Sequence, residues 1–472
     1  MMKHTGCKTD IPIRILQVST VDIAGGAEKV TLNLHRAYRQ RGHHAWLAVG
    51  RKYSNEAHVV LIPNDRYCNL WVRGCSVIRD YLASEERLRN LRRILGLVAR
   101  AGEPLRFLNR WRGLEDFHFP GTWQLLTLSP ESPDIIHCHN LHGGYFDLRA
   151  LPWLSQQMPV VLTLHDAWLL SGHCAHSFGC ERWKTGCGNC PDLTIYPAIK
   201  RDATAYNWQR KRDIYAHSRL YVATPSQWLM RKVEQSMLAP AIQEAMVIPN
   251  GVDLSVFRPT DDRKAVRASL GIPLDAKVLL FAANGIRRSI WRDFQMMRSA
   301  VAQVAERLQG AKVLFLALGE NAAPERIGRA TVQFIPYQND PAVVARYYQS
   351  ADVYVHAARA EAWGLVMTEA LACGTPVVAT AVGGIPEQVE DGITGFLVPP
   401  GDAKGMAEAI IMLLTDDALR MRFERNAVKD AQRRFDLNRQ VDDYLGWYRE
   451  ILETLQGREK PEQEKASCAV QP

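Results

Sequence analysis

The stretch from Glu361 to Pro376, EAWGLVMTEALACGTP, places two carboxylates eight residues apart with a glycine between them. An apolar, β-branched run, ADVYVHAAR (351–359), precedes it, and a second one, PVVATAVGG (376–384), follows it. The residues between 365 and 372 are good helix formers, so the pattern predicts strand, loop, helix and strand. Such a parallel βαβ unit places Glu361 at the carboxyl end of a strand, where open α/β sheets bind ligands.

The two glutamates suit the two ends of a nucleotide diphosphate sugar. Gly364 lets a ligand approach the backbone, and the start of the following helix attracts phosphate through its amides and its dipole. At helical rise, Glu361 and Glu369 lie roughly 12 Å apart. The alternative is a solvated Glu369 and a Glu361 that only favours the helix start.

Composition indicates an ordinary globular protein. The chain has 472 residues, of which 47% are hydrophobic and 23% charged, which is enough for two domains. A net charge of +8 does not by itself indicate a nucleic-acid partner. The sequence shows neither a signal peptide nor a membrane span. We expect a cytoplasmic protein, with membrane contact only peripheral, at the inner face of the cell membrane.

Strand-like and helix-like segments alternate through both halves, which predicts an α/β fold of two doubly wound parallel-sheet (Rossmann-like) domains. The turn-rich segment VIPNGVDLSVFRP (247–259) marks the boundary. The expected segments are an N-terminal acceptor-side domain (11–250), a C-terminal donor-binding domain (251–435), a helix returning to the first domain (436–455) and a disordered tail (456–472).

The first half holds a glycine turn and a basic insertion. Gly25 and Gly26 precede a predicted helix, and a tight turn explains them as well as a phosphate does. The insertion covers about 66–125, and between Arg66 and Arg112 it holds eleven arginines against four acids, interleaved with apolar residues at helical intervals. These helices would either meet anionic lipid or a lipid-diphosphate acceptor, or pack on the core with a solvated basic face.

Histidines end two predicted strands of this half. His137 and His139 follow one strand, and His165 follows the next, beside Asp166. A histidine at this edge can bind a ligand hydroxyl or transfer a proton. A single such histidine would favour a structural role, but two strands together favour a site.

The segment HDAWLLSGHCAHSFGCERWKTGCGNCPDL (165–193) contains four clustered cysteines in the loop 173–191. The closing C-x-x-C and the Gly-Cys turns favour a structural zinc site, with an iron–sulfur centre, a redox pair or plain thiols as alternatives. The predicted ligands are Cys174, Cys180, Cys187 and Cys190.

The second half opens with the predicted strand KVLLFAANG (277–285), which runs into Arg287, Arg288 and Arg292. These arginines would neutralise a diphosphate facing Gly364, or form a solvated cluster. No D-x-D motif occurs in the chain, so no acidic clamp for a catalytic metal is expected. Arginines, glycine amides and a helix dipole must then stabilise the leaving nucleotide, and catalysis requires no cofactor.

The segment EAWGLVMTEALACGTPVVATAVGGIPEQVEDGITGFLVPPGD (361–402) resembles the donor site of the family 4 glycosyltransferases, retaining enzymes of the GT-B fold with two glutamates separated by seven residues. GGAEKV, TLHD, VIPNGVDLSVFRP and the final helix extend the resemblance. The cysteine-rich stretch resembles bacterial exopolysaccharide and colanic-acid-type enzymes. The resemblance implies two domains facing a cleft, a nucleotide-diphosphate-sugar donor, and a glycan or lipid-linked oligosaccharide acceptor in cell-surface polysaccharide biosynthesis.

The resemblance also implies roles by position. Glu361 would contact the donor sugar at the reacting centre and Glu369 the ribose, while His165 would bind sugar hydroxyls. The remaining implied donor contacts are the amides around Gly364 and Leu365, the turn of Gly25 and Gly26, and Arg287 or Arg288 with Arg292.

The chain departs from the family where Arg292-Asp293 replaces Lys-Gly and where His356-Ala357 stands instead of Pro-Ser. The predicted reaction is a front-face displacement with retention, in which a donor phosphate oxygen takes the acceptor proton. The alternatives are a nucleotide-sugar epimerase of the same fold and a non-catalytic nucleotide-sugar-binding subunit.

Overall fold

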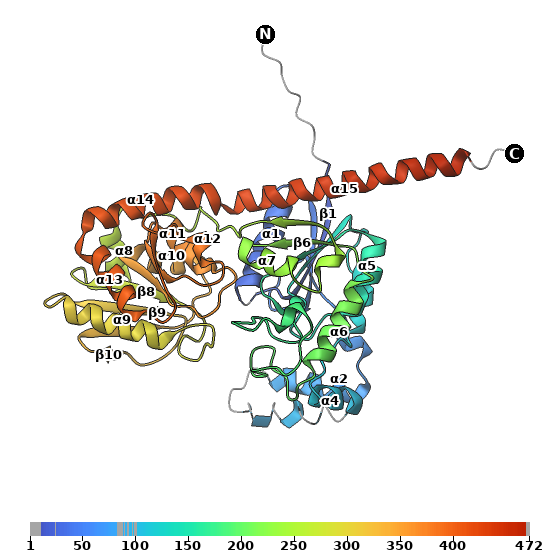
Figure 1. Cartoon of the computed structure of the whole chain (residues 1–472), viewed down its shortest axis with the longest axis horizontal. Helices are drawn as coiled ribbons and strands as arrows, with labels where there is room; N and C mark the ends of the chain where they lie inside the picture. The colour runs from blue at the N-terminus through green and yellow to red at the C-terminus, as the bar shows by residue number, and fades with distance from the viewer. Residues whose placement is uncertain are drawn as a thin grey trace, which may run out of the picture. The chain divides into compact units, whose positions relative to one another are not determined.

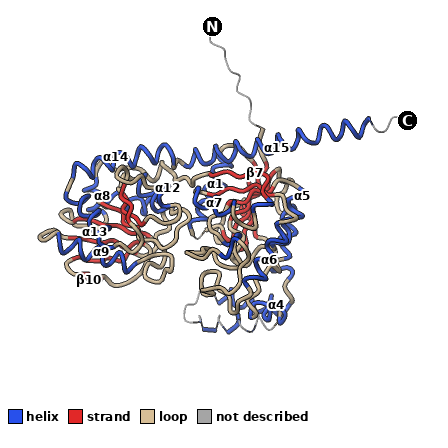
Figure 2. Tube along the Cα trace, in the orientation of Figure 1, coloured by secondary structure: helices blue, strands red, loops and turns tan. Residues whose placement is uncertain are grey.

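The computed structural model describes residues 11–23, 25–82, 88, 90–91, 94–96, 98 and 102–468. It divides into two compact units, each built on a seven-stranded sheet. Unit 1 comprises Met1–Ala223, Lys232–Met246 and Leu445–Pro472, and unit 2 comprises Thr224–Arg231 and Val247–Tyr444. Figures 1 and 2 show strands surrounded by helices in each unit, which confirms the predicted α/β class.

The sheet of unit 1 has the strand order β3-β2-β1-β4-β5-β6-β7. Every strand pair from β3 to β6 is parallel. The direction of strand addition reverses between β1 and β4, and ligands bind beside such a switch point. The strands are β1 (Arg14–Val21), β2 (His44–Arg51), β3 (Val59–Leu61), β4 (Ile135–His139), β5 (Val160–Thr163), β6 (Leu220–Thr224) and β7 (Ile242–Val247).

The helices of unit 1 include two from the basic insertion, α2 and α4. They are α1 (Gly26–Gln40), α2 (Leu70–Tyr81), α4 (Pro104–Trp111), α5 (Leu151–Gln157) and α6 (Thr204–Tyr215), and α7 (Gln227–Glu234) crosses the boundary between the units. Short 3-10 turns are η1 (Asn64–Tyr67), η4 (Pro120–Thr127), η5 (Leu148–Ala150), η6 (Trp168–Leu170), η7 (Arg182–Lys184) and η8 (Ala239–Ala241).

The sheet of unit 2 has the order β10-β11-β9-β8-β12-β13-β14, so its switch point lies between β8 and β12. All its pairs are parallel except β10 with β11, an antiparallel edge pair that the sequence did not predict. The strands are β8 (Lys277–Ala282), β9 (Val313–Leu318), β10 (Glu325–Ile327), β11 (Ala330–Ile335), β12 (Val353–His356), β13 (Val377–Thr380) and β14 (Gly395–Val398).

Helices cover this second sheet. α9 packs against α13, and α11 packs against α10 and α14. Strands β8, β12 and β13 are almost wholly buried, as expected for a parallel sheet covered on both faces. The helices are α8 (Arg263–Ser269), α9 (Phe294–Arg307), α10 (Pro341–Ser350), α11 (Leu365–Ala372), α12 (Ile385–Gln388), α13 (Ala403–Thr415) and α14 (Asp417–Arg434).

The last helix, α15 (Leu437–Cys468), carries the chain from unit 2 back into unit 1 (Figure 1). In unit 1 the Tyr448 hydroxyl lies 2.6 Å from His137 Nδ1, and Trp447 donates to Glu244 at 2.8 Å. The sequence led us to expect a helix only to 455 and a disordered tail after it. The helix instead continues to Cys468; the Glu, Gln and Lys residues of this segment favour helix, although Gly457 and Pro461 do not. No helix in the described part of the chain is long and apolar enough to cross a membrane.

Candidate functional site

A loop after β8 lies against the loop after β12 in unit 2. The Asp293 amide donates to the Ala357 carbonyl and the Arg359 amide to the Trp291 carbonyl, both at 2.9 Å. Arg292 forms a β-bridge with Ala358 between these two bonds. This backbone pairing brings the Arg292 side chain to the start of the Glu361 loop, at the carboxyl edge beside the switch point.

Arg292, His356 and Glu361 form a charged cluster in which His356 is fully buried and the other two side chains are mostly buried. The Arg292 Nη2 atom lies 2.8 Å from Glu361 Oε2, and His356 Nε2 lies 3.7 Å from the same oxygen. Two atoms of the cluster, Arg292 Nε and His356 Nε2, are buried without a hydrogen-bond partner among the described residues, while Glu361 Oε2 is engaged by Arg292. Because buried polar groups are normally satisfied, two such atoms beside an ionised carboxylate indicate a site for a polar ligand.

The charges of this cluster follow from its burial. Burial raises the pKa of Glu361, but Arg292 and then His356 outweigh that effect and bring the pKa to about 2. Burial, helped by the Arg292 cation, lowers the pKa of His356 to about 4. At neutral pH the cluster therefore holds one carboxylate, one guanidinium and a neutral imidazole.

Two glycines after β13 hold the Glu361 backbone. The Gly384 amide donates to the Glu361 carbonyl at 3.0 Å. Gly383 has a φ of +59°, and a Cβ atom there would lie 1.8 Å from the same carbonyl oxygen. Only glycine permits this close approach.

Glycine 364 is the N-cap of α11, but the Gln388 side chain engages its peptide groups. The Gly364 amide donates to Gln388 Oε1 at 3.1 Å, and Gln388 Nε2 donates to the Gly364 carbonyl at 3.0 Å. The Gly364 amide, which we expected to contact the diphosphate, therefore already has a hydrogen-bond partner within the protein. The diphosphate contact stays a prediction for the amide of Leu365, the first residue of α11.

Glu369 is buried, with 4% of its surface exposed, and its Oε2 accepts a hydrogen bond from the Tyr348 hydroxyl at 3.1 Å. The alternative of a solvated Glu369 is therefore wrong. The helix buries this residue because α11 packs against α10, which carries Tyr348. Its contact with a ribose stays a prediction.

The three predicted arginines separate in the structure. Only Arg292 contacts Glu361. Arg287 pairs with Glu320 at 2.6 Å and stacks over the Phe334 ring, and Arg288 is exposed. The structure does not bring Arg287 or Arg288 into the buried cluster.

In unit 1, the predicted histidines meet at the carboxyl edge of β4 and β5. His139 Nδ1 lies 3.0 Å from His165 Nε2, and the two rings stack. Burial lowers the pKa of His165 to about 4, so its imidazole is neutral. His137 is wholly buried between Tyr448 and Thr163, which gives it a structural role.

The same edge holds a pair that the sequence analysis missed. His142 Nε2 lies 2.7 Å from Asp166 Oδ2. Burial lowers the pKa of His142, but the Asp166 carboxylate outweighs burial and raises it above the ordinary value. His142 follows a strand that ends in His-Cys-His-Asn, and this histidine-rich ending was the available signal.

Gly25 and Gly26 form the start of α1, with Gly25 as N-cap. The Gly25 amide donates to Glu28 Oε2 at 3.1 Å, and Glu28 closes a capping box. The turn therefore has a structural explanation, and its contact with a diphosphate stays a prediction.

The four clustered cysteines line one small cavity together with His173. The Gly172 amide donates to Cys187 Sγ at 3.3 Å, and His173 Nε2 lies 3.4 Å from Cys190 Sγ. Among the described residues, however, no three His, Cys, Asp or Glu side chains are arranged to hold a metal ion. Zinc at this loop stays a prediction.

Comparison with known proteins covers both units. Residues 24–256 match the family described as Glycosyltransferase Family 4, and residues 262–430 match Glycosyl transferases group 1. A D-inositol 3-phosphate glycosyltransferase from Catenulispora acidiphila is 30% identical over 344 residues, which cover 70% of this chain and 75% of the relative. The resemblance to exopolysaccharide enzymes stays a prediction.

Solved structures share the fold. Sucrose-phosphate synthase from Thermosynechococcus elongatus has a TM-score of 0.59 at 19% identity and covers 94% of this chain and 100% of its own. The Anabaena protein HepE, solved with UDP and glucose, has a TM-score of 0.58 at 19% identity over 94% of this chain and 99% of its own. At such identity the likeness concerns the fold alone.

Proposed function

This chain belongs to the group 1 and family 4 glycosyltransferases, with a GT-B fold, and we propose that it transfers a sugar from a nucleotide diphosphate sugar to a glycan or lipid-linked oligosaccharide. The observation that carries this proposal is the cluster of Arg292, His356 and Glu361, in which Arg292 Nε and His356 Nε2 are buried and lack hydrogen-bond partners among the described residues. Sugar hydroxyls would supply those partners. HepE was solved with UDP-glucose, which supports a donor of this class.

The proposed mechanism is a front-face displacement with retention. Glu361 and the neutral His356 would hold donor-sugar hydroxyls, and Arg292 would keep the carboxylate ionised and oriented. Positioning of this kind and charge stabilisation supply most of the rate when the protein itself transfers no proton. A donor phosphate oxygen would take the acceptor proton, and no metal would be needed.

The test uses purified full-length protein with UDP-glucose and other nucleotide sugars. We expect binding in a thermal-shift assay, slow release of the sugar to water without an acceptor, and retained anomeric configuration by NMR. Glu361→Gln should lower that release at least about a hundredfold, whereas the matched variant Glu320→Gln should leave it unchanged. Near-normal release by Glu361→Gln would refute the assigned role.

The same assay separates the alternatives. Conversion of the donor into an epimer without release would indicate an epimerase, and binding without any turnover would indicate a non-catalytic subunit. Radiolabel transferred to lipid-linked oligosaccharide would support the proposed acceptor in cell-surface polysaccharide biosynthesis. Transfer to inositol phosphate instead would indicate the acceptor named for the Catenulispora relative.

We also propose a peripheral contact of unit 1 with the inner face of the cell membrane. Helix α2 exposes Leu70, Trp71, Val77 and Tyr81, and Arg73 lies among them. Exposed apolar residues with a nearby cation suit an anionic lipid surface. Sedimentation with phosphatidylglycerol vesicles should carry the wild type down and leave Trp71→Glu in solution, and equal sedimentation of both would contradict the proposal.

A further inference from the structure

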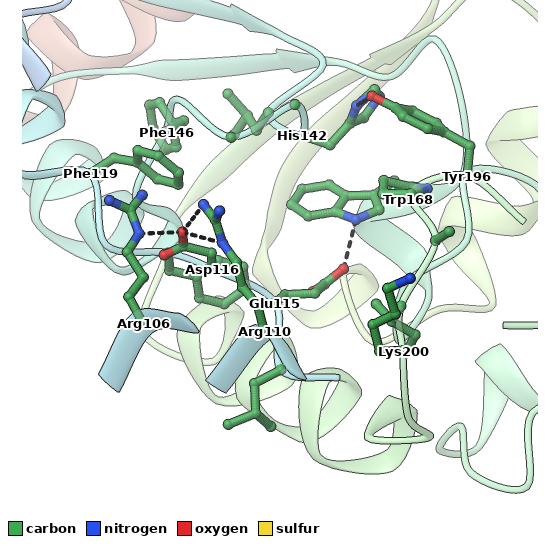
Figure 3. Close-up of a pocket in the computed structure, with 18 of the residues that line it drawn as sticks. Arg106, Arg110, Glu115, Asp116, Phe119, His142, Phe146, Trp168, Tyr196 and Lys200 are labelled. Atoms are coloured by element: carbon green, nitrogen blue, oxygen red, sulfur yellow. Dashed lines mark hydrogen bonds and ion pairs between the residues drawn. The ribbon is translucent and has the colours of Figure 1, made fainter. Parts of the chain in front are cut away.

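Unit 1 contains a cavity of about 640 Å³ that is lined in part by the basic insertion but by none of the individually predicted site residues (Figure 3). Its walls come from α4, the segment after β4, Trp168 after β5 and the segment 196–200. The volume lies within the range of about 300–1,000 Å³ typical of small-molecule sites. His142, at the carboxyl edge of the sheet, is part of its lining.

Three partly exposed aromatic rings line the cavity. Phe107, Trp111 and Tyr196 are exposed by 48%, 44% and 48% of their surface. Large apolar rings gathered around a hollow indicate a ligand that covers them, because water contact with such rings is unfavourable. Arg201 stacks on Trp111 at 3.4 Å from its ring centre, so this ring is already held in place.

Between the rings, the polar groups are held rigidly. Figure 3 shows Arg106 and Arg110 on either side of Asp116, and Arg110 Nε donates to Asp116 Oδ2 at 3.0 Å. The buried Glu115 accepts from Trp168 Nε1 at 2.7 Å. Pairing leaves little net charge in the cavity but keeps donors and acceptors at fixed positions around its wall.

This combination matches a sugar ring. A pyranose has an apolar C–H face, which packs on aromatic rings, and a rim of hydroxyls, which need oriented donors and acceptors. A polyprenyl chain would exclude water from the Arg110 guanidinium, whose side chain is 47% exposed, without replacing the lost hydrogen bonds, which is unfavourable. We propose that this cavity binds a saccharide unit of the acceptor, with a hydroxyl directed toward the Tyr196 hydroxyl, which lies 3.3 Å from His142 Nδ1. The acceptor assignment rests on the proposed function.

The test measures saccharide binding by full-length protein, using quenching of tryptophan fluorescence by maltose, cellobiose, lactose, chitobiose and mannobiose. We expect saturable quenching by at least one disaccharide. Tyr196→Ala and Phe107→Ala should weaken that binding at least about tenfold through loss of ring contact. Tyr53→Ala removes an exposed tyrosine of the same unit outside the cavity and should have no effect.

The outcomes separate this proposal from the proposed function. Glu361→Gln should bind the disaccharide normally, because Glu361 belongs to unit 2. Failure of UDP and UDP-glucose to bind would refute the donor function. It would not affect the test of saccharide binding by the cavity of unit 1. The cavity proposal is overturned if no disaccharide quenches saturably, if Tyr196→Ala and Phe107→Ala bind as wild type does, or if farnesyl phosphate binds there and the sugars do not.

Discussion

Replacement of Arg292 by methionine removes the cation that faces Glu361 at 2.8 Å and keeps a side chain of similar length. The cluster brings the pKa of Glu361 from its ordinary value of 4.5 to about 2. At about 1.4 kcal/mol per pKa unit, this gap corresponds to about 3 kcal/mol of stability. Removal of one partner of a buried ion pair costs about 3–5 kcal/mol, because the remaining charge is left uncompensated. We therefore expect Arg292→Met to lose at least about 3 kcal/mol.

The assay is urea unfolding at pH 7, followed by circular dichroism, on Arg292→Met, Glu361→Gln and the double variant. The double variant should lose less than Arg292→Met alone, because no buried carboxylate is then left unpaired. Arg287→Met is the matched control. Its partially exposed pair with Glu320 should contribute less than about 1 kcal/mol.

The pH dependence gives a second measure of the same interaction. Because the folded pKa of Glu361 is depressed, its contribution is present above pH 4.5 and is lost as the pH falls from 4.5 toward 2. Glu361→Gln should flatten this part of the stability profile. A coupling energy between Arg292 and Glu361 below about 0.5 kcal/mol would refute the reasoning. So would a Glu361→Gln variant whose stability falls with acid as steeply as that of the wild type.

Three further predictions concern other parts of the chain. Gly383→Ala should destabilise the protein by more than about 2 kcal/mol in the same urea assay, because its Cβ would meet the Glu361 carbonyl. Gly401 also has a positive φ but faces open space, so Gly401→Ala should cost less. Tyr348→Phe removes the hydroxyl that donates to the buried Glu369 at 3.1 Å and should cost about 1–3 kcal/mol and weaken UDP binding, whereas Tyr347→Phe should do neither; equal effects would contradict the role of the hydroxyl. Metal analysis should find about one zinc per chain, lost in Cys187→Ser and retained in Cys68→Ser, and zinc-free wild-type protein would show that the cysteine loop is not a metal site.

The sequence by itself determined the fold class and predicted where the candidate site lies. Buried apolar runs such as 277–282 and 353–356 alternate with helical segments, and this periodicity is local, so it can be detected without coordinates. The spacing of Glu361 and Glu369 around Gly364 is also local. The sequence did not show that α15 continues past residue 455, because the polar residues after 455 suit both a disordered tail and a solvated helix.

Only the tertiary structure decided which side chains meet. Arg287, Arg288 and Arg292 look equivalent in the sequence, and Arg292 alone reaches Glu361 because its backbone pairs with the loop after β12. Glu115 and Lys211 are 96 residues apart, yet they form a buried ion pair behind Trp168 at the wall of the cavity. Such contacts depend on strand order and burial, which bring distant segments together. They produce no periodic pattern in the sequence from which they could be predicted.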